Sequence, residues 1–363
     1  MKKLISLALA FFLALTLAVP AFAADAGMDN FQKVKTYTGF SDVASNHWAA
    51  SAIQTCYEYD LMRGNSDTTF NLTGDLTIAE ALVMAAKVHE IYATGTSTVA
   101  PGGTPWYQPF VDYCVNAQII GADEFADYGA KATRAQMAGI FARALPSSEF
   151  TSTSPYSPPD VTGSTPYYSE ILKLYASGIL SGSDIYGTFK PNDSISRGEA
   201  AVIISRVAIA ESRSVKVLMK DVTLADGVVA AVPQDILDMS DYAGMPALGS
   251  ETSIILTYGE KDDLYAGLDI SLMPQDEFNA LMKDSFGFEM TDVQTSLVKF
   301  GNLTAYRTTS HTVLEGMDLD MVTYTYIHDS TMTMVFLGSS VSDDLTVMAN
   351  NLRINGSGVG SKM

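Results

Sequence analysis

The chain has 363 residues, with 22 Lys and Arg against 41 Asp and Glu, so its net charge is −19 at pH 7. This balance excludes nucleic acid as an expected partner, because binding to a phosphate backbone needs clustered positive charge. A chain of this length exceeds one ordinary hydrophobic core, so we expect two domains. An anionic ligand would have to meet a few local cations, which should be visible as isolated arginines.

Residues 1–23 have the order of a secretory signal peptide. Lys2 and Lys3 precede an apolar run from Leu4 to Val19, and a small-x-small cleavage site follows at 21–23. Removing this segment leaves 20 basic against 41 acidic side chains, a net charge of −21. No later segment has the roughly 20 apolar residues that a membrane-spanning helix needs. We therefore expect an exported protein without a transmembrane segment.

Cys56 and Cys114 are the two cysteines. Neither lies in a metal-ligand spacing with another Cys or a His pair. Two interpretations stay open, a disulfide formed in an oxidising compartment and two buried thiols that act as small hydrophobes. We favour the second, because free Cys is commonly buried.

Three segments between Phe40 and Arg206 resemble one another, which predicts three structural repeats. The distance from Asp42 to Gly64 equals that from Asp160 to Gly182, and the middle copy lacks the opening aspartate. We place the repeats at residues 38–96, 97–146 and 155–213, followed by a second domain at 214–363. Each repeat predicts two helices, the first over 48–61, 106–120 or 167–180. The second begins with a capping box, formed by Thr77 with Glu80, Thr133 with Gln136, and Ser196 with Glu199.

These elements resemble the S-layer homology family, whose repeats open with F-x-D-V and a Trp, pass a G-I-x-G turn and close on T-R-A-E. The resemblance covers roughly residues 38–212. It implies a compact, all-α pseudo-threefold bundle of three repeats. It also implies non-covalent anchoring of an exported protein at the cell surface, through an anionic cell-wall polysaccharide or another peptidoglycan-linked polymer. In this family the polysaccharide often carries a pyruvyl ketal and binds in grooves between repeats.

The resemblance implies that Arg134 and Arg197 contact this polymer. Each follows a capping residue, where the helix dipole disfavours a cation but free N–H groups attract an anion. A ligand carboxylate would suit the guanidinium fork, and an ion pair with a nearby carboxylate of the chain is the alternative. The first repeat has Ile78 at this position, so we expect its site to be weak or lost.

Other site residues also have two interpretations. Trp48, Trp106 and Tyr167 would stack on sugar rings or pack in the core. Asp42 and Asp160 would hydrogen-bond a sugar or cap the following helix, and capping is slightly favoured. Lys87, Arg143 and Arg206 occupy matching places further along the second helices, which favours packing or salt bridges.

Beyond residue 213 the alternation of Thr, Tyr, Met and Val predicts an α+β domain with an antiparallel sheet. We expect a helix from Pro274 to about Phe286 and a last helix over 343–352, with a hairpin at Asp329-Ser330. The predicted strands are 253–259, 265–272, 297–300, 303–309, 320–328 and 331–337. The pattern faintly resembles the PsbP-type fold, which by itself would not fix a function.

The sequence contains no recognisable catalytic motif. His89-Glu90 lacks the second histidine of a zinc-protease helix, and no G-x-S-x-G elbow or P-loop occurs. Asp318 and Asp320 with Glu315 offer oxygen ligands for Ca²⁺, but acidic loops are common on exported proteins. We expect no metal, no cofactor and no enzymatic activity, and hence a displayed C-terminal domain. The alternatives are a wall-anchored binding or adhesion module and, less favoured, a hydrolase with its site in 214–363.

Overall fold

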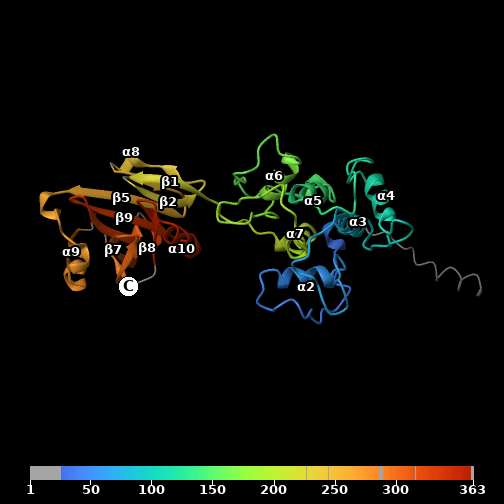
Figure 1. Ribbon diagram of the computed structural model, residues 1–363, viewed down its shortest axis with the longest axis horizontal. Helices are drawn as coiled ribbons and strands as arrows, with labels where there is room; N and C mark the ends of the chain where they lie inside the picture. The colour runs from blue at the N-terminus through green and yellow to red at the C-terminus, as the bar shows by residue number, and fades with distance from the viewer. Residues whose placement is uncertain (1–25, 226, 244, 286–288, 315, 361–363) are drawn as a thin grey trace, which may run out of the picture. The chain divides into compact units, whose positions relative to one another are not determined.

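The computed structural model describes residues 26–360 apart from 226, 244, 286–288 and 315, so the predicted signal peptide lies outside the described residues. The chain separates into two compact units (Figure 1). The first holds the described residues up to Ser152, Thr162–Leu180 and Pro191–Ser214. The second holds Thr153–Val161, Ser181–Lys190 and the residues from Val215 onward. Across the described part of the chain, no helix combines the length and apolar character that a bilayer crossing requires.

Helices of the first unit come in equivalent pairs, one pair from each repeat. The first helices are α2 (Ala50–Glu58), α4 (Gln108–Asn116) and α6 (Tyr168–Ala176), and the second helices are α3 (Ile78–Thr94), α5 (Arg134–Phe141) and α7 (Arg197–Ala208). Short 3₁₀ turns occupy η1 (Met28–Asn30), η2 (Ser147–Glu149) and η3 (Ala210–Ser212). All three predicted capping boxes are confirmed, so each second helix begins with reciprocal side-chain and backbone hydrogen bonds.

Each first helix packs against the second helix of another repeat. The contacts are α2 with α7, α4 with α3, and α6 with α5. Two equivalent thiols lie in these contacts, where Cys56 Sγ is 3.2 Å from the Ala201 carbonyl and Cys114 Sγ is 3.6 Å from the Leu82 carbonyl. Both cysteines are buried and free, so the preferred interpretation is confirmed and the disulfide is wrong.

The three repeats meet in a closed ring of backbone hydrogen bonds, which we call the junction ring. Its members are Leu76, Ala132 and Ile195, none of which has any solvent exposure. The Leu76 N–H donates to the Ile195 carbonyl at 2.9 Å, Ile195 to Ala132 at 3.2 Å, and Ala132 to Leu76 at 2.8 Å. Antiparallel bridges flank the ring at Asp75–Ser196, Thr77–Lys131 and Thr133–Ser194. Each repeat is thereby tied to both of the others.

The first N–H groups of every second helix are also paired across repeats. An α-helix leaves its first four N–H groups without partners inside the helix. In α5, Arg134 and Ala135 donate to the carbonyls of Asp193 and Pro191 at 2.9 and 3.0 Å. In α3, the Ile78 N–H donates to the Ala130 carbonyl and the Ala79 N–H to the Tyr128 carbonyl. In α7, the Arg197 N–H donates to the Gly74 carbonyl and the Gly198 N–H to the Leu72 carbonyl. The backbone of each repeat therefore completes the helix start of its neighbour.

Ion pairs follow the same cyclic order. Arg134 Nη1 lies 2.6 Å from Glu199 Oε1, and Arg197 Nη1 lies 3.5 Å from Glu80 Oε1. In each pair, the arginine that directly follows the N-cap residue in one repeat contacts the capping-box glutamate of the next repeat. The third equivalent pair is Ile78 with Gln136, which has no charge on either side. The position that lacks the arginine, Ile78, and the position that lacks the glutamate, Gln136, therefore belong to the same interface, between the first and second repeats.

The expected all-α bundle is wrong. The segments before the second helices are extended and form β-bridges across repeats, and the second unit is rich in strands arranged in two antiparallel sheets. The physical reason in the first unit is that buried backbone polar groups must be paired. Packing of helix faces alone would leave those groups unsatisfied at the place where the three repeats meet.

The second unit contains a four-stranded and a seven-stranded sheet. The first has the order β1 (Met219–Ala225), β2 (Val228–Pro233), β10 (Arg353–Ile354), β11 (Ser357–Gly358). The second has the order β3 (Leu237–Asp238), β4 (Ala247–Gly249), β5 (Ser253–Lys261), β9 (Thr331–Ser339), β8 (Met317–His328), β7 (Leu303–Leu314), β6 (Thr291–Phe300). Helices α8 (Ser240–Ala243), α9 (Gln275–Ser285) and α10 (Ser342–Asn350) complete the unit, together with the turns η4 (Asp263–Tyr265) and η5 (Ile270–Leu272).

Two apolar clusters cover opposite faces of the larger sheet. One includes Val322 and Leu337 of the sheet, Val232 of β2 and Met348 of α10. The other includes Met334 of the sheet with Phe278 of α9 and Ile270 of η5. Figure 1 shows α10 beside β8 and α9 at the far end of the sheet. The smaller sheet and α10 therefore share one core on one side of the larger sheet.

Most predicted elements of this unit are confirmed, and the errors have physical causes. Strands at 253–259, 297–300, 303–309, 320–328 and 331–337 lie within β5 to β9, and both predicted helices are present. The Asp329-Ser330 hairpin is confirmed, with positive φ at both residues. The strand predicted at 265–272 is wrong, because Asp262 and Asp269 side chains accept backbone N–H groups and start 3₁₀ turns there.

We predict that the two thiols are inert in the folded protein. Burial raises the pKa of both, that of Cys114 to about 12, which leaves almost no thiolate at neutral pH. A thiol-specific chromogenic reagent should therefore label neither cysteine in native protein and both after unfolding. A reducing agent should leave the melting temperature unchanged. Rapid labelling of native protein, or a melting temperature lowered by reduction, would contradict this assignment.

We predict that the third ion pair can be installed by changing both partners. Ile78→Arg alone should destabilise the fold by about 3 kcal/mol, because it buries an uncompensated charge. Ile78→Arg with Gln136→Glu should recover part of that loss, with a coupling free energy of about 1–2 kcal/mol in a double-mutant cycle. Denaturant unfolding of the four proteins measures this quantity. Strictly additive effects would mean that the two positions do not face each other.

Candidate functional site

Arg197 is enclosed by the first repeat rather than open to solvent. Its Nε donates to the Phe70 carbonyl at 3.0 Å and its Nη2 to the Arg63 carbonyl at 2.8 Å. The guanidinium also lies 4.9 Å from the centre of the Phe70 ring, and the residue is 8% exposed. Burial lowers the pKa of Arg197, and the Glu80 charge opposes this shift. The planar guanidinium therefore holds a backbone turn and a ring together.

Arg134 is equally enclosed, at 6% exposed. The two carboxylate oxygens of its partner Glu199 accept different hydrogen bonds. Oε2 accepts the Ser196 N–H at 2.9 Å in the capping box, and Oε1 accepts from Arg134 at 2.6 Å. The ion-pair alternative is thus the arrangement that the structure contains for both arginines. Contact of either guanidinium with a ligand stays a prediction.

These helix starts do not present free N–H groups to an anion, contrary to the prediction. The Arg134 and Arg197 N–H groups donate to the Asp193 and Gly74 carbonyls, each at 2.9 Å. A ligand carboxylate that reached either guanidinium would have to replace the Glu199 or Glu80 carboxylate. The sequence could not reveal this, because the carbonyls that fill the helix starts come from distant repeats.

The two aspartates fix the loops that precede the second helices. Asp42 accepts the N–H groups of Phe70 and Asn71 at 2.8 and 2.7 Å, and Asp160 accepts those of Phe189 and Lys190, both at 2.7 Å. Capping of the following helix is wrong for both, since α2 and α6 have no side-chain cap. Burial raises the pKa of Asp42, but the hydrogen bonds from Phe70 and Asn71 outweigh it and lower that pKa.

Both tryptophans lie on the surface. Trp48 is 64% exposed and Trp106 is 46% exposed, so packing in the core is wrong for both. Each lies two residues before the first residue of its helix, α2 or α4. The residue in that place before α6 is Pro166, so Tyr167 is not the counterpart of the tryptophans. The first unit therefore presents two equivalent large aromatic rings to solvent.

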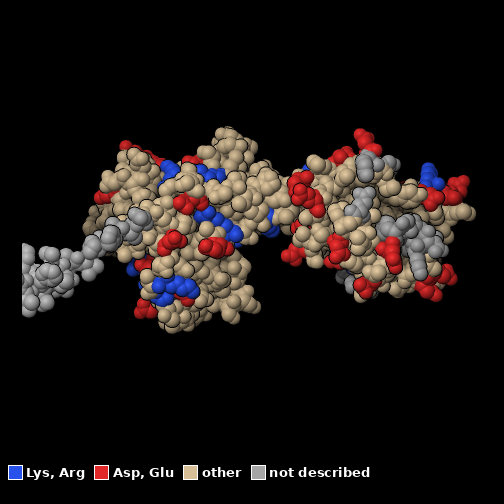
Figure 2. All heavy atoms as spheres, turned by 180° about the vertical axis from the view of Figure 1, so that it is seen from behind, with Lys and Arg blue, Asp and Glu red and all other residues tan. Residues whose placement is uncertain are grey.

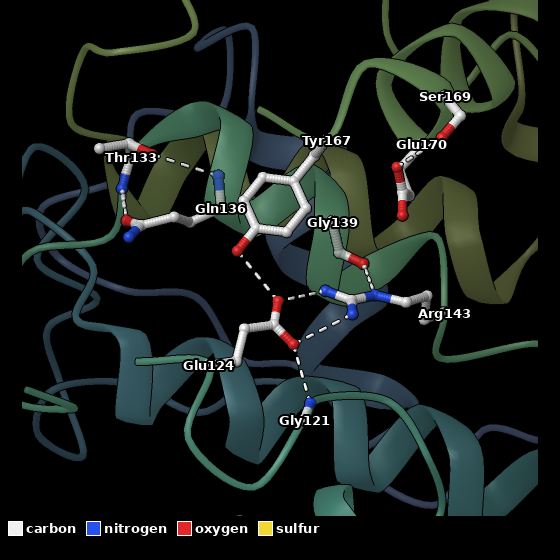
Figure 3. Close-up of polar contacts among 9 residues, drawn as sticks. All are labelled: Gly121, Glu124, Thr133, Gln136, Gly139, Arg143, Tyr167, Ser169 and Glu170. Atoms are coloured by element: carbon white, nitrogen blue, oxygen red, sulfur yellow. Dashed lines mark hydrogen bonds and ion pairs between the residues drawn. The ribbon is translucent and has the colours of Figure 1, made fainter. Parts of the chain in front are cut away.

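Tyr167 instead belongs to a half-buried polar cluster with Glu124 and Arg143 (Figure 3). Arg143 donates to Glu124 Oε1 at 2.7 Å and Oε2 at 3.1 Å, and the Tyr167 hydroxyl donates to Oε1 at 2.9 Å. The Arg143 guanidinium lies 5.6 Å from the centre of the Tyr167 ring, and its Nε donates to the Gly139 carbonyl. A Cβ at Gly139 would lie 2.3 Å from that ring, so only glycine fits. The predicted packing role of Arg143 is confirmed.

Four cations of the first unit lie near one another, and we call Lys35, Arg63, Lys87 and Arg197 the cationic cluster. Lys35 and Lys87 both contact the carboxylate of Asp60, with Lys87 Nζ at 2.9 Å. Burial lowers the pKa of Lys87, and the like charges of Lys35 and Arg63 lower it further. On the face shown in Figure 2, most of the visible Lys and Arg side chains lie on the first unit, and Asp and Glu prevail on the second.

This cluster was not predicted from the sequence. Its members come from four separated segments, so no single local motif marks them. A net charge of −19 was a usable signal, because any gathering of cations stands out against it.

In the second unit, His311 lies between two carboxylates. His311 Nε2 lies 2.7 Å from Asp318 Oδ1, and its Nδ1 lies 3.2 Å from Asp320 Oδ1. The Asp320 hydrogen bond is the main reason that the pKa of His311 is raised. Among the described residues, no group of three or more His, Cys, Asp or Glu side chains could hold a metal ion. Glu315, considered for Ca²⁺ binding, lies outside the described residues.

Comparisons with known proteins match the repeats. The model of the S-layer homology domain matches residues 39–71 and 159–201. An endoglucanase of Bacillus sp. (strain KSM-635) is 24% identical over 209 residues, which are 56% of this chain and 22% of that protein. The chain thus spans less than a quarter of that relative. A crystal structure from Bacteroides thetaiotaomicron has 9% identity and a TM-score of 0.20, over 38% of this chain and 41% of that one, and carries no argument.

The family model matches parts of the first and third repeats, which contain the Asp42 and Asp160 loops described above. Domains of this family bind polymers of the bacterial cell wall. The chain therefore contains S-layer homology repeats, which indicate a protein at the cell surface or associated with the wall.

Proposed function

We propose that the first unit anchors an exported protein by binding an anionic polysaccharide of the wall. The observation that carries this proposal is the exposure of Trp48 and Trp106 at equivalent positions. An exposed aromatic ring has a face available to a partner, and an aromatic face suits the apolar face of a pyranose ring. The signal-peptide pattern of residues 1–23 supports export.

The cationic cluster supports an anionic polymer. Arg63 is exposed, and its charge adds to those of Lys35 and Lys87 around the carboxylate of Asp60. Such a local excess of positive charge attracts a carboxylate such as a pyruvyl ketal, although the protein as a whole is acidic. We propose that Arg134 and Arg197 hold the walls of the grooves, because their guanidinium groups are buried against the chain's own carboxylates.

We further propose that the second unit is displayed and performs no catalysis. Its Ser342 Oγ and His311 Nδ1 both bond to Asp320, at 3.2 Å each. In this arrangement the carboxylate separates the hydroxyl from the imidazole, so the imidazole is not placed to take the hydroxyl proton. General-base activation of a serine requires those two groups to be in direct contact.

We predict that removal of the two exposed rings weakens anchoring. The variant Trp48→Ala with Trp106→Ala should bind purified cell-wall sacculi about 30-fold more weakly, since each stacking contact contributes about 1 kcal/mol. Tyr258→Ala, which removes an exposed ring of the second unit, is the matched control and should bind normally. Sedimentation with sacculi measures both. Full binding by the double variant would refute the stacking role.

We predict that the charge of the polymer matters and that Arg134 does not contact it. Lys35→Gln with Arg63→Gln should weaken binding about tenfold at low salt, and wall stripped of its secondary polymer should not bind the parent protein. Arg134→Met with Glu199→Gln, which removes both charges of one pair, should leave binding within about twofold. Loss of binding in this last variant, with an unchanged circular dichroism spectrum, would make Arg134 a ligand residue after all.

A further inference from the structure

The second unit has a hollow of about 380 Å³ between α10 and strands β7 and β8. Its lining comes from three places in the chain. The strands contribute Arg307, His311 and Asp320, the helix contributes Thr346 and Asn350, and Asp292 comes from an irregular part of β6. Pockets that hold small ligands usually measure about 300–1,000 Å³. This hollow is therefore large enough for one or two sugar residues.

Groups of both charge signs surround the hollow. Arg307, His311, Asp292 and Asp320 belong to the lining, and Asp318 lies against His311. His311 is held between two carboxylates, with Nδ1 3.2 Å from Asp320 and Nε2 2.7 Å from Asp318. A free anion would meet two carboxylates there, and a free cation would meet the guanidinium and the imidazole. This mixture disfavours any ligand with a net charge.

Hydrogen-bonding groups of both kinds face the same space. The Thr346 hydroxyl donates to the Ser342 carbonyl at 2.8 Å, and the Ser342 hydroxyl donates to Asp320 at 3.2 Å, so both hydroxyl oxygens keep lone pairs that can accept. Arg307 and Asn350 supply N–H donors. Val322, Leu345 and Ala349 form an apolar part of the lining. A ring with many hydroxyl groups and an apolar face matches this combination of donors, acceptors and apolar surface.

We infer that this hollow binds a neutral, polyhydroxylated ligand of one or two sugar residues. The site lies wholly within the second unit, so it is separate from the wall-binding residues of the first. It would let an anchored protein hold a second, uncharged glycan while the first unit holds the anionic polymer. This role goes beyond passive display and does not depend on the identity of that polymer.

The test follows backbone amide resonances of the ¹⁵N-labelled mature chain during titration with N-acetylglucosamine and with glucose. The Trp48→Ala, Trp106→Ala background removes the rings proposed for the first unit. We expect shifts that saturate with millimolar affinity and fall on residues 307–311, 320–322 and 342–350. Glucuronate and glucosamine, which carry opposite charges, should bind at least about tenfold more weakly.

One substitution in α10 and one at the residue that precedes this helix localise the effect. Thr346→Trp places a large ring in the hollow at a surface position and should abolish the shifts. Val341→Trp, an exposed position outside the lining, is the matched control and should leave them intact. Arg307→Gln should weaken binding as a second, independent variant. Shifts that persist in Thr346→Trp, stronger binding of a charged sugar, or no shifts up to about 100 mM of either neutral sugar would each overturn the inference.

Binding of the same variants to sacculi separates the two proposals. Thr346→Trp should sediment with sacculi as the parent protein does, because its substitution lies in the second unit. Loss of sugar binding with retained sacculus binding removes only the inference about the hollow. Loss of sacculus binding in the Trp48, Trp106 variant with retained shifts in the hollow supports both.

Discussion

The structure of the first unit depends on one requirement, that backbone polar groups be paired where three chain segments meet out of contact with water. An unpaired buried N–H costs about as much as a lost hydrogen bond or more. Leu76, Ala132 and Ile195 meet this requirement cyclically, and the carbonyls next to them complete the helix starts of α3, α5 and α7. No single repeat can satisfy these groups by itself. Cooperation among the three repeats therefore arises in the main chain before any side chain is considered.

Side-chain chemistry then follows the backbone. Because the helix starts are enclosed, the charge of an arginine directly after the N-cap residue must be neutralised within the protein. The capping-box glutamate of the next repeat neutralises it, at an N–O distance of 2.6 Å for Arg134 and 3.5 Å for Arg197. A residue type associated with ligand binding is thereby recruited to hold neighbouring repeats together. Groups that stay available to an external polymer are those outside the enclosed starts, namely the tryptophans before the first helices and the cations around Asp60.

Much of the local structure could be predicted from the sequence, because its causes are local. Capping boxes, the Asp329-Ser330 turn and the helix after Pro274 depend on residues within a few positions of one another. The all-α bundle was wrong because the β-bridges join residues as far apart as Asp75 and Ser196. Site residues divide in the same way. Exposure of Trp48 and enclosure of Arg197 depend on which distant segment covers each side chain, and no spacing encodes that.

The exchange of helices between repeats has a consequence for how such a sequence can change. The first helix of one repeat and the second helix of another form one packing unit, and the loss of charge at Ile78 is matched by Gln136 in a different repeat. Substitutions that are harmless together can thus be harmful alone, even though they lie in separate copies. The unit within which substitutions must stay compatible is therefore the interface between two repeats and not the single repeat. Three copies that began alike are therefore expected to diverge as three distinct interfaces, each tolerating its own residues.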